Sequence, residues 1–126
     1  MPSPRDALQT RRILVVEDNY LIGEHVRSVL ERAGCDVLGP VGRLGPALEL
    51  VRATAALDGA VLDINLDGQT CFPVATALAE RAVPFFFLTG YDNLALIPAE
   101  FAARTVLPKP LDAARLIELA ATTFAA

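Results

Sequence analysis

Short apolar runs alternate with amphipathic segments along most of the chain, and this alternation restricts the folds that the chain can adopt. The runs expected to form strands are residues 12–17, 35–40, 57–63, 83–88 and 105–107. The segments between them carry apolar residues at helical spacing, with charged residues on the opposite face. Strands that alternate with helices over short connections favour a parallel sheet with helices on both faces.

The expected helices differ in their regularity. Residues 20–33 present one apolar face and are followed by Gly34, where a left-handed C-terminal cap is expected. Further helices are expected at three places, which are 44–51, 71–81 and the segment after Asp112. Residues 93–103 contain Pro98, which lacks a backbone N–H group, so this helix should be short, irregular or mobile.

Together these elements predict an α/β fold of the flavodoxin-like type, which is a doubly wound, five-stranded parallel sheet with helices on both faces. Right-handed crossover connections favour the strand order 2-1-3-4-5, with the strands numbered along the chain. Residues 1–11 contain two prolines and several polar residues, and we expect them to form a flexible N-terminal tail. Residues 12–126 have a length that suits one domain.

Composition argues against several classes of function. The 126 residues carry a formal net charge of −4 without a cluster of Lys and Arg, which argues against nucleic acid or an anionic membrane as a partner. Cys35 and Cys71 are far apart and form no CxxC motif, so a zinc site is not expected. The sequence has no secretory signal and no apolar run near the roughly 18 residues of a membrane span, so we expect a cytoplasmic protein.

Acids, a hydroxyl group and a lysine follow the ends of four expected strands, at Glu17, Asp18, Asp63, Thr89 and Lys109. Because the carboxyl ends of parallel strands meet at one edge of the sheet, we expect these side chains to converge. Converging carboxylates repel each other by about 1 kcal/mol per pair at 4 Å in water, and by more inside a protein. Protonation of one acid relieves this repulsion, and so does a divalent cation such as Mg²⁺, which prefers oxygen ligands.

A carboxylate placed beside a cation can also act as a nucleophile. Asp63 could attack phosphorus and form an acyl phosphate. The transferred group carries charge on its equatorial oxygens, so catalysis depends on positioning and charge neutralisation. Lys109 can pair with one of these oxygens as a point charge, and the Thr89 hydroxyl can donate a hydrogen bond to another.

The ordered set of strand-end residues resembles a bacterial two-component receiver domain, over the chain from about residue 12 to the end. The residues that carry the resemblance are Glu17–Asp18, Asp63, Thr89 and Lys109–Pro110. The resemblance implies that Asp63 is the phosphoacceptor. It also implies that Thr89 and Lys109 contact the phosphoryl group.

The resemblance further implies a Mg²⁺ cofactor and its ligands. Asp18 and Asp63 would bind the ion directly, and Glu17 would support it through water. The backbone carbonyl of Asn65 would be the third protein ligand. The Lys109–Pro110 peptide bond would be cis, an isomer that costs about 0.5–1 kcal/mol before proline.

One residue departs from the family pattern. Val106 stands three residues before the lysine, where the family usually has a Tyr or Phe that acts as a rotating switch. Residues 84–91 read PFFFLTGY and resemble the PFxFATGY subgroup, whose members are often stand-alone domains, with Leu88 in place of Ala. We hypothesise that Tyr91 takes over part of the switching or gates the pocket. The switch candidates are therefore Thr89, Tyr91 and Val106.

The function that the resemblance implies is that of a single-domain response regulator in a phosphorelay. Such a protein is not an enzyme with a separate substrate, because it catalyses only its own phosphorylation and dephosphorylation. The expected phosphodonor is a sensor histidine kinase or a histidine phosphotransfer protein. A downstream protein would bind the surface formed by helix 93–103, strand 105–107 and the last helix.

Three alternatives remain open at this point. A degenerate receiver would bind a partner without being phosphorylated; the intact set of acids counts against it, although the missing aromatic at Val106 leaves it open. A phosphatase of the haloacid dehalogenase type would also use an Asp at a strand end. This class requires a second acid two residues later as general acid and base, and here that position is Asn65. A flavin-binding module shares the fold. A phosphate-bearing cofactor is usually bound by a Gly-rich or hydroxyl-rich loop after the first strand, whereas acids follow the first strand here.

Overall fold

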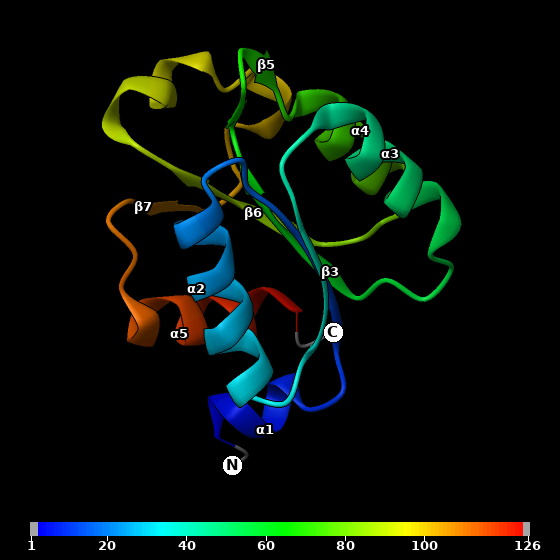
Figure 1. Cartoon of the computed structure of the whole chain (residues 1–126), viewed down its shortest axis with the longest axis vertical. Helices are drawn as coiled ribbons and strands as arrows, with labels where there is room; N and C mark the ends of the chain where they lie inside the picture. Colours follow the sequence, from blue (N-terminus) through cyan, green and yellow to red (C-terminus); the bar gives the residue numbers. More distant parts are fainter. Residues whose placement is uncertain (1–2, 125–126) are drawn as a thin grey trace.

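Five parallel strands form the central sheet, in the order that the sequence predicts (Figure 1). The computed structural model describes residues 3–124, apart from the side chains of residues 91–93. The strands are β1 (Arg12–Val16), β2 (Asp36–Val41), β3 (Gly59–Asp63), β6 (Phe85–Thr89) and β7 (Val106–Pro108). They lie in the order β2-β1-β3-β6-β7 with each neighbouring pair parallel, which confirms the flavodoxin-like fold class.

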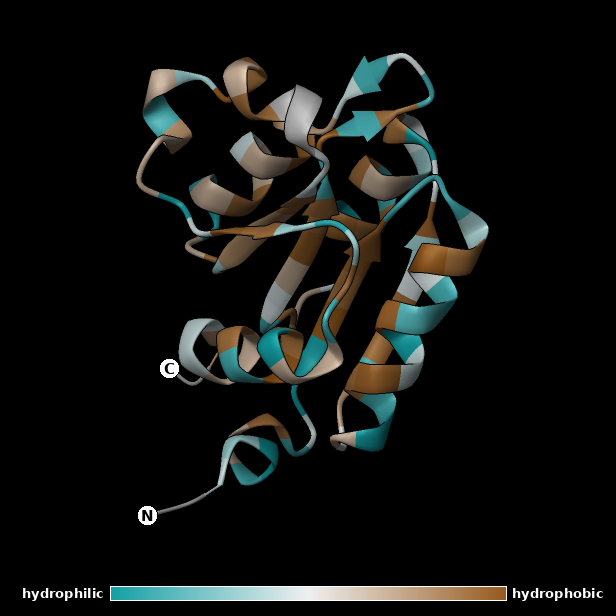
Figure 2. Cartoon of the chain, turned by 90° about the vertical axis from the view of Figure 1, so that its left-hand side faces the viewer, coloured by the Kyte–Doolittle hydropathy of each residue, from teal (hydrophilic) through white to brown (hydrophobic). Residues whose placement is uncertain are grey.

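Helices cover both faces of the sheet and create two hydrophobic cores. The helices are α1 (Pro4–Leu8), α2 (Tyr20–Arg32), α3 (Leu44–Ala53), α4 (Phe72–Glu80) and α5 (Ala113–Phe124). Alternate side chains of a strand point to opposite faces. In β1, Leu14 and Val16 pack with residues of α3 and α4, whereas Ile13 and Val15 pack with residues of α1, α2 and α5. Figure 2 shows the resulting hydrophobic strands at the centre of the fold.

The C-terminus of α2 ends as the glycine signal predicts. Gly34 has φ 97°, in the left-handed region. Its N–H donates to the carbonyl of Glu31 at 2.9 Å, and the N–H of Cys35 donates to the carbonyl of Leu30 at 3.0 Å. This pair of bonds is the Schellman motif, which satisfies carbonyl groups that the end of a helix leaves free.

The segment after β6 is irregular, as the proline predicts. It consists of two 3₁₀ turns, η1 (Tyr91–Leu96) and η2 (Ala99–Phe101), and Pro98 stands at the N-cap of η2. Phe101 anchors the segment, because its ring is buried against the rings of three other phenylalanines, with centroids 5.7–6.3 Å apart. In η1, the described side chains of residues 94–96 are exposed.

The edge strand β2 contains a bulge that the sequence analysis did not anticipate. The pairing register with β1 shifts by one residue between Leu14 and Val16, so Gly39 and Pro40 together stand where a regular ladder has one residue. Gly39 has φ 101°, and a Cβ there would lie 2.5 Å from the carbonyl oxygen of Val15. Only glycine fits this position. The Gly39–Pro40 peptide bond is cis.

A small antiparallel hairpin stands between β3 and α4, and the sequence analysis did not predict it. Its strands are β4 (Asn65–Leu66) and β5 (Gln69–Thr70). The two-residue turn Asp67–Gly68 has positive φ at both positions, 51° and 85°, as the type I′ turns of hairpins require. The hairpin is largely hydrophilic and lies at the top of Figure 2.

Residues 3–11 differ from the flexible tail that the sequence predicts, because they include the helix α1. Ser3 and Asp6 form a capping box at its start. Leu8 at its end is fully buried in the core with α2 and α5, and its carbonyl accepts a hydrogen bond from the Cys35 thiol at 3.6 Å. The helix is too short to be stable alone, so tertiary contacts hold it. Residues 1–2 of the expected tail lie outside the described part of the chain.

We predict that Leu8→Ala lowers the free energy of unfolding by about 2–5 kcal/mol, because it removes a fully buried leucine. The matched control is Leu21→Ala, since Leu21 is 77% exposed and its loss should change stability by less than about 0.5 kcal/mol. Urea denaturation of the two variants measures both values. Equal, small changes would show that α1 does not contribute to the folded domain.

Candidate functional site

Five of the predicted site residues lie at the carboxyl edge of the sheet, where each ends or follows a strand. Glu17 and Asp18 follow β1, Asp63 ends β3, and Thr89 ends β6. Lys109 directly follows β7. Buried parallel strands fix the positions of these residues, because β3 and β6 are buried along their whole length.

Three carboxylates converge at this edge, as the sequence predicts. One carboxylate oxygen each from Glu17, Asp18 and Asp63 can be chosen so that all three atoms lie within 4.8 Å of one another. Glu17 and Asp63 are each only 3% exposed, whereas Asp18 is exposed. The mutual repulsion is therefore poorly screened by water at two of the three acids.

Lys109 supplies the positive charge that faces these acids. Its Nζ atom lies 3.2 Å from Oε1 of Glu17 and 3.5 Å from Oδ1 of Asp63. The backbone N–H of Lys109 donates to the carbonyl of Thr89 at 2.8 Å, which fixes the chain where it leaves β7. The Lys109–Pro110 peptide bond is cis, the isomer that the resemblance implies.

The protonation of Asp63 reflects this environment. Burial raises the pKa of Asp63 to about 8, and the neighbouring carboxylate of Glu17 adds to the rise, while the ammonium of Lys109 opposes it. In the protein alone, one lysine is therefore not enough to keep Asp63 ionised at neutral pH.

The donor atoms at the site fit a hard divalent cation. Oε2 of Glu17 is buried and has no hydrogen-bond partner among the described residues, which is unfavourable for a carboxylate oxygen. Oε1 of the same residue accepts a hydrogen bond from the N–H of Asn19 at 3.1 Å. Carboxylate oxygens with such unused acceptor capacity are the ligands that Mg²⁺ prefers. Glu17, Asp18 and Asp63 are the residues that would hold it.

The backbone carbonyl of Asn65, which the resemblance implies as a ligand, lies two residues after Asp63 in β4. Three residue pairs follow one another along the hairpin. Leu66 and Gln69 close the turn, Asn65 and Thr70 come next, and then the N–H of Cys71 donates to the carbonyl of Ile64 at 2.9 Å. Hydrogen-bonded and non-hydrogen-bonded pairs alternate in an antiparallel ladder. The pair of Asn65 is therefore non-hydrogen-bonded, and its carbonyl is turned away from β5.

The three switch candidates differ in how far the structure describes them. Thr89 is buried, and its hydroxyl donates to the carbonyl of Gly90 at 3.3 Å. Val106 is half-buried in β7, paired in register with Phe87. The side chain of Tyr91 lies outside the described residues, so its proposed role stays a prediction.

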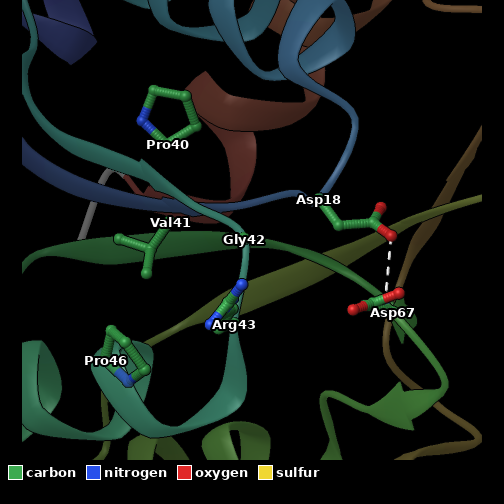
Figure 3. Close-up of a pocket in the computed structure, with 7 residues that line it drawn as sticks. All are labelled: Asp18, Pro40, Val41, Gly42, Arg43, Pro46 and Asp67. Carbon is green, nitrogen blue, oxygen red and sulfur yellow. Dashed lines mark hydrogen bonds between the residues drawn. The ribbon is translucent and has the colours of Figure 1, made fainter.

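A hollow of about 530 Å³ opens beside Asp18, and sequence analysis did not anticipate it (Figure 3). Its other polar side chains come from Arg43, before α3, and from Asp67 in the hairpin turn. The N–H of Asp67 donates to Oδ2 of Asp18 at 3.1 Å, the dashed line in Figure 3. Gly42 lies against Asp18, because a Cβ there would be 3.2 Å from the Asp18 Cα. The Asp67–Gly68 dipeptide is a sequence signal for the turn, but it does not identify the partner of the Asp67 N–H group.

Within the part of the chain that the structure describes, no helix is both long enough and apolar enough to cross a bilayer.

Comparison with known proteins agrees with this geometry. Aerobic respiration control protein ArcA of Escherichia coli K12 is 31% identical over 108 residues, which cover 83% of this chain and 44% of ArcA. The solution structure of SdrG from Sphingomonas melonis Fr1 is 34% identical with a TM-score of 0.72, and the match covers 94% of this chain and 95% of SdrG. A response regulator receiver protein from Sinorhizobium medicae is 26% identical with a TM-score of 0.75, over 91% of this chain and 94% of that protein.

The chain thus spans less than half the length of ArcA. Residues 13–121 match the family model described as the response regulator receiver domain. This match covers most of the chain and includes each strand end that carries a site residue. The chain therefore belongs to the response regulator receiver domain family.

Proposed function

We propose that Asp63 accepts a phosphoryl group from a phosphohistidine, carried by a sensor histidine kinase or a histidine phosphotransfer protein. The observation that carries this proposal is the position of the buried Asp63 carboxylate, 3.5 Å from the ammonium of Lys109 and grouped with Glu17 and Asp18. Membership of the receiver family supports the same role. We place the protein in the cytoplasm as part of this proposal.

The proposed reaction transfers a phosphoryl group from an imidazole nitrogen of the donor histidine to a carboxylate oxygen of Asp63. One oxygen of the ionised Asp63 carboxylate attacks phosphorus and forms the P–O bond of an acyl phosphate. The P–N bond to the donor imidazole breaks, and its electron pair stays with the nitrogen. Lys109 pairs with one phosphoryl oxygen, and the Thr89 hydroxyl donates to another.

The metal in this proposal is Mg²⁺, held by Asp18, Asp63 and the carbonyl of Asn65, with Glu17 acting through water. A bound Mg²⁺ supplies positive charge that favours the ionised form of the acids and neutralises oxygens of the incoming phosphoryl group. The unpartnered oxygen of Glu17 and the raised pKa of Asp63 both support a site built for added positive charge.

The proposed output is a change in a protein-binding surface. A phosphoryl group adds a charge of about −1.5 to −2 next to Thr89 and Lys109. The adjacent surface of η1, β7 and α5 includes Leu94 and Leu96, which are 45% and 51% exposed. An irregular segment with few buried side chains can change conformation at small energetic cost. We propose that a downstream protein binds there, and that catalysis is limited to phosphorylation and dephosphorylation of Asp63.

The phosphatase alternative gains no support from the hairpin. Asn65 stands where a second acid would act, and its side-chain Oδ1 accepts a hydrogen bond from the N–H of Gly68 at 3.1 Å. A carboxamide has no proton that titrates near neutral pH, so Asn65 cannot serve as the general acid or base that this class of phosphatase requires.

Phosphorylation by a small donor tests the proposed function. Incubation with Mg²⁺ and phosphoramidate should add one phosphoryl group to the wild-type chain, measured by intact-protein mass spectrometry. Asp63→Asn should remain unmodified. Asp112→Asn is the matched control, because Asp112 is an exposed acid outside the acid cluster and asparagine also serves as a helix N-cap. Rapid multiple turnover of a phosphate ester would instead indicate the phosphatase, and no modification at all would indicate the degenerate receiver.

Metal-free protein should lose stability as pH rises. Asp63 has a pKa of about 8 in the folded protein and about 4 in the unfolded chain. Between about pH 4 and pH 8 the folded protein therefore holds one more proton than the unfolded chain, and the free energy of unfolding falls as the pH rises through this range. Asp63→Asn has no such proton, and its stability should fall less over the same range. Urea titrations in EDTA at a series of pH values measure both slopes. Parallel curves for the two proteins would contradict the raised pKa.

The switch hypothesis predicts unequal effects of two substitutions. Tyr91→Ala should impair the response to beryllofluoride more than Val106→Ala, if the tyrosine has taken over part of the role of the missing aromatic. Amide chemical-shift changes in residues 94–104 on addition of beryllofluoride and Mg²⁺ measure the response. Equal and negligible effects of the two substitutions would remove the hypothesis.

A further inference from the structure

We propose that the β4–β5 hairpin positions the Asp18 carboxylate for the cation, with Asp67 and Gly68 as positioning residues. This inference rests on the proposed function only in that it assumes Mg²⁺ as the ion. Asp67 and Gly68 lie outside the acid cluster, and neither is among the residues that the receiver resemblance brings to the site.

The contact that carries the inference joins the turn to a metal-ligating side chain. The Asp67 N–H donates to Oδ2 of Asp18 at 3.1 Å, across 49 residues of sequence. Asp18 is the exposed member of the acid cluster, so the hydrophobic core does not restrict its rotamer. A backbone donor fixes one oxygen and leaves the other oxygen with free acceptor sites. The bond therefore sets the direction in which Asp18 faces Glu17 and Asp63.

The position of this donor depends on the turn. Asp67 and Gly68 adopt φ of 51° and 85°, and a turn of this type aims the two N–H groups in fixed directions. The Gly68 N–H donates back to Oδ1 of Asn65 at 3.1 Å, which closes the turn. Any other turn conformation would move the Asp67 N–H away from Asp18.

The base of the hairpin is rigid, whereas its tip depends on polar contacts. Ile64 and Leu66 are buried in the core with α3 and α4, so they hold the strand that leaves Asp63. The strands are two residues long, and so small a hairpin is marginally stable without other support. The same hairpin carries the Asn65 carbonyl. One folded turn thus places two of the groups proposed to bind the cation.

Gly68→Ala tests this inference with little other disturbance. A Cβ at Gly68 would meet no atom within 4 Å, so the substitution acts through backbone conformation alone. Alanine populates the left-handed region far less readily than glycine, and the apparent dissociation constant for Mg²⁺ should rise about tenfold as the correct turn becomes a minor state. Isothermal titration calorimetry with MgCl₂ measures this change.

Two further variants separate positioning from general destabilisation. Gly68→Asn should recover most of the affinity, because asparagine tolerates positive φ. Gly45→Ala is the matched control, since its Cβ would also meet nothing within 4 Å but its backbone is helical, and its Mg²⁺ affinity should equal that of the wild type. A loss of affinity in Gly68→Ala without recovery in Gly68→Asn would overturn the role of the turn.

A measurement without metal isolates the hydrogen bond itself. In EDTA, the amide of Asp67 should exchange with deuterium about tenfold more slowly in the wild type than in Asp18→Ala. Equal exchange in the two proteins would overturn the inference even if the wild type binds Mg²⁺. Absence of Mg²⁺ binding by the wild type would instead overturn the proposed metal site, and normal Mg²⁺ binding by Gly68→Ala would overturn the positioning role alone.

Discussion

Two buried carboxylates that share one ammonium group are the constraint around which this structure is arranged. Glu17 and Asp63 both face Nζ of Lys109, at 3.2 and 3.5 Å, and the exposed Asp18 adds a third carboxyl group nearby. Such a cluster is unfavourable on its own, because burial removes the water that would screen it. Buried neighbouring strands hold the acids together, because Glu17 and Asp18 follow β1 and Asp63 ends β3, and these two strands pair in the middle of the sheet. The core thus maintains an excess of negative charge that a cation or a proton can relieve.

The sequence predicts the sheet and the acid cluster because both rest on local signals. Apolar runs give the strands, strand order follows from crossover handedness, and the charged residues mark the strand ends. Other features depend on contacts that no local pattern contains. Helix α1 is held by Leu8 in the core between α2 and α5, although the Ser3–Asp6 capping box was a readable signal. The bond from Asp67 to Asp18 spans the fold, and nothing near either residue in the sequence reveals it.

Val106 lies beside a cluster of largely buried aromatic side chains. It pairs with Phe87, whose ring lies in a cluster with Phe72, Phe85 and Phe101. This cluster belongs to the core with α3 and α4, and it fixes η2 through Phe101. The four phenylalanine side chains of this cluster pack together and hold the end of the irregular segment at Phe101. The side chains of Leu94 and Leu96, in the preceding 3₁₀ turn, are by contrast 45% and 51% exposed.

The two edges of the sheet have a consequence for how this domain can meet other molecules. The edge strand β2 carries the bulge at Gly39 and a proline without an N–H group, and the opposite edge, β7, is three residues long and ends in Pro108. Interrupted, proline-bearing edges are poor templates for strand addition from another chain. Growth of the sheet into fibrils or strand-swapped assemblies is therefore disfavoured at both ends. The surfaces better suited to a specific contact are those formed by helices and loops, some of which border the acidic cluster.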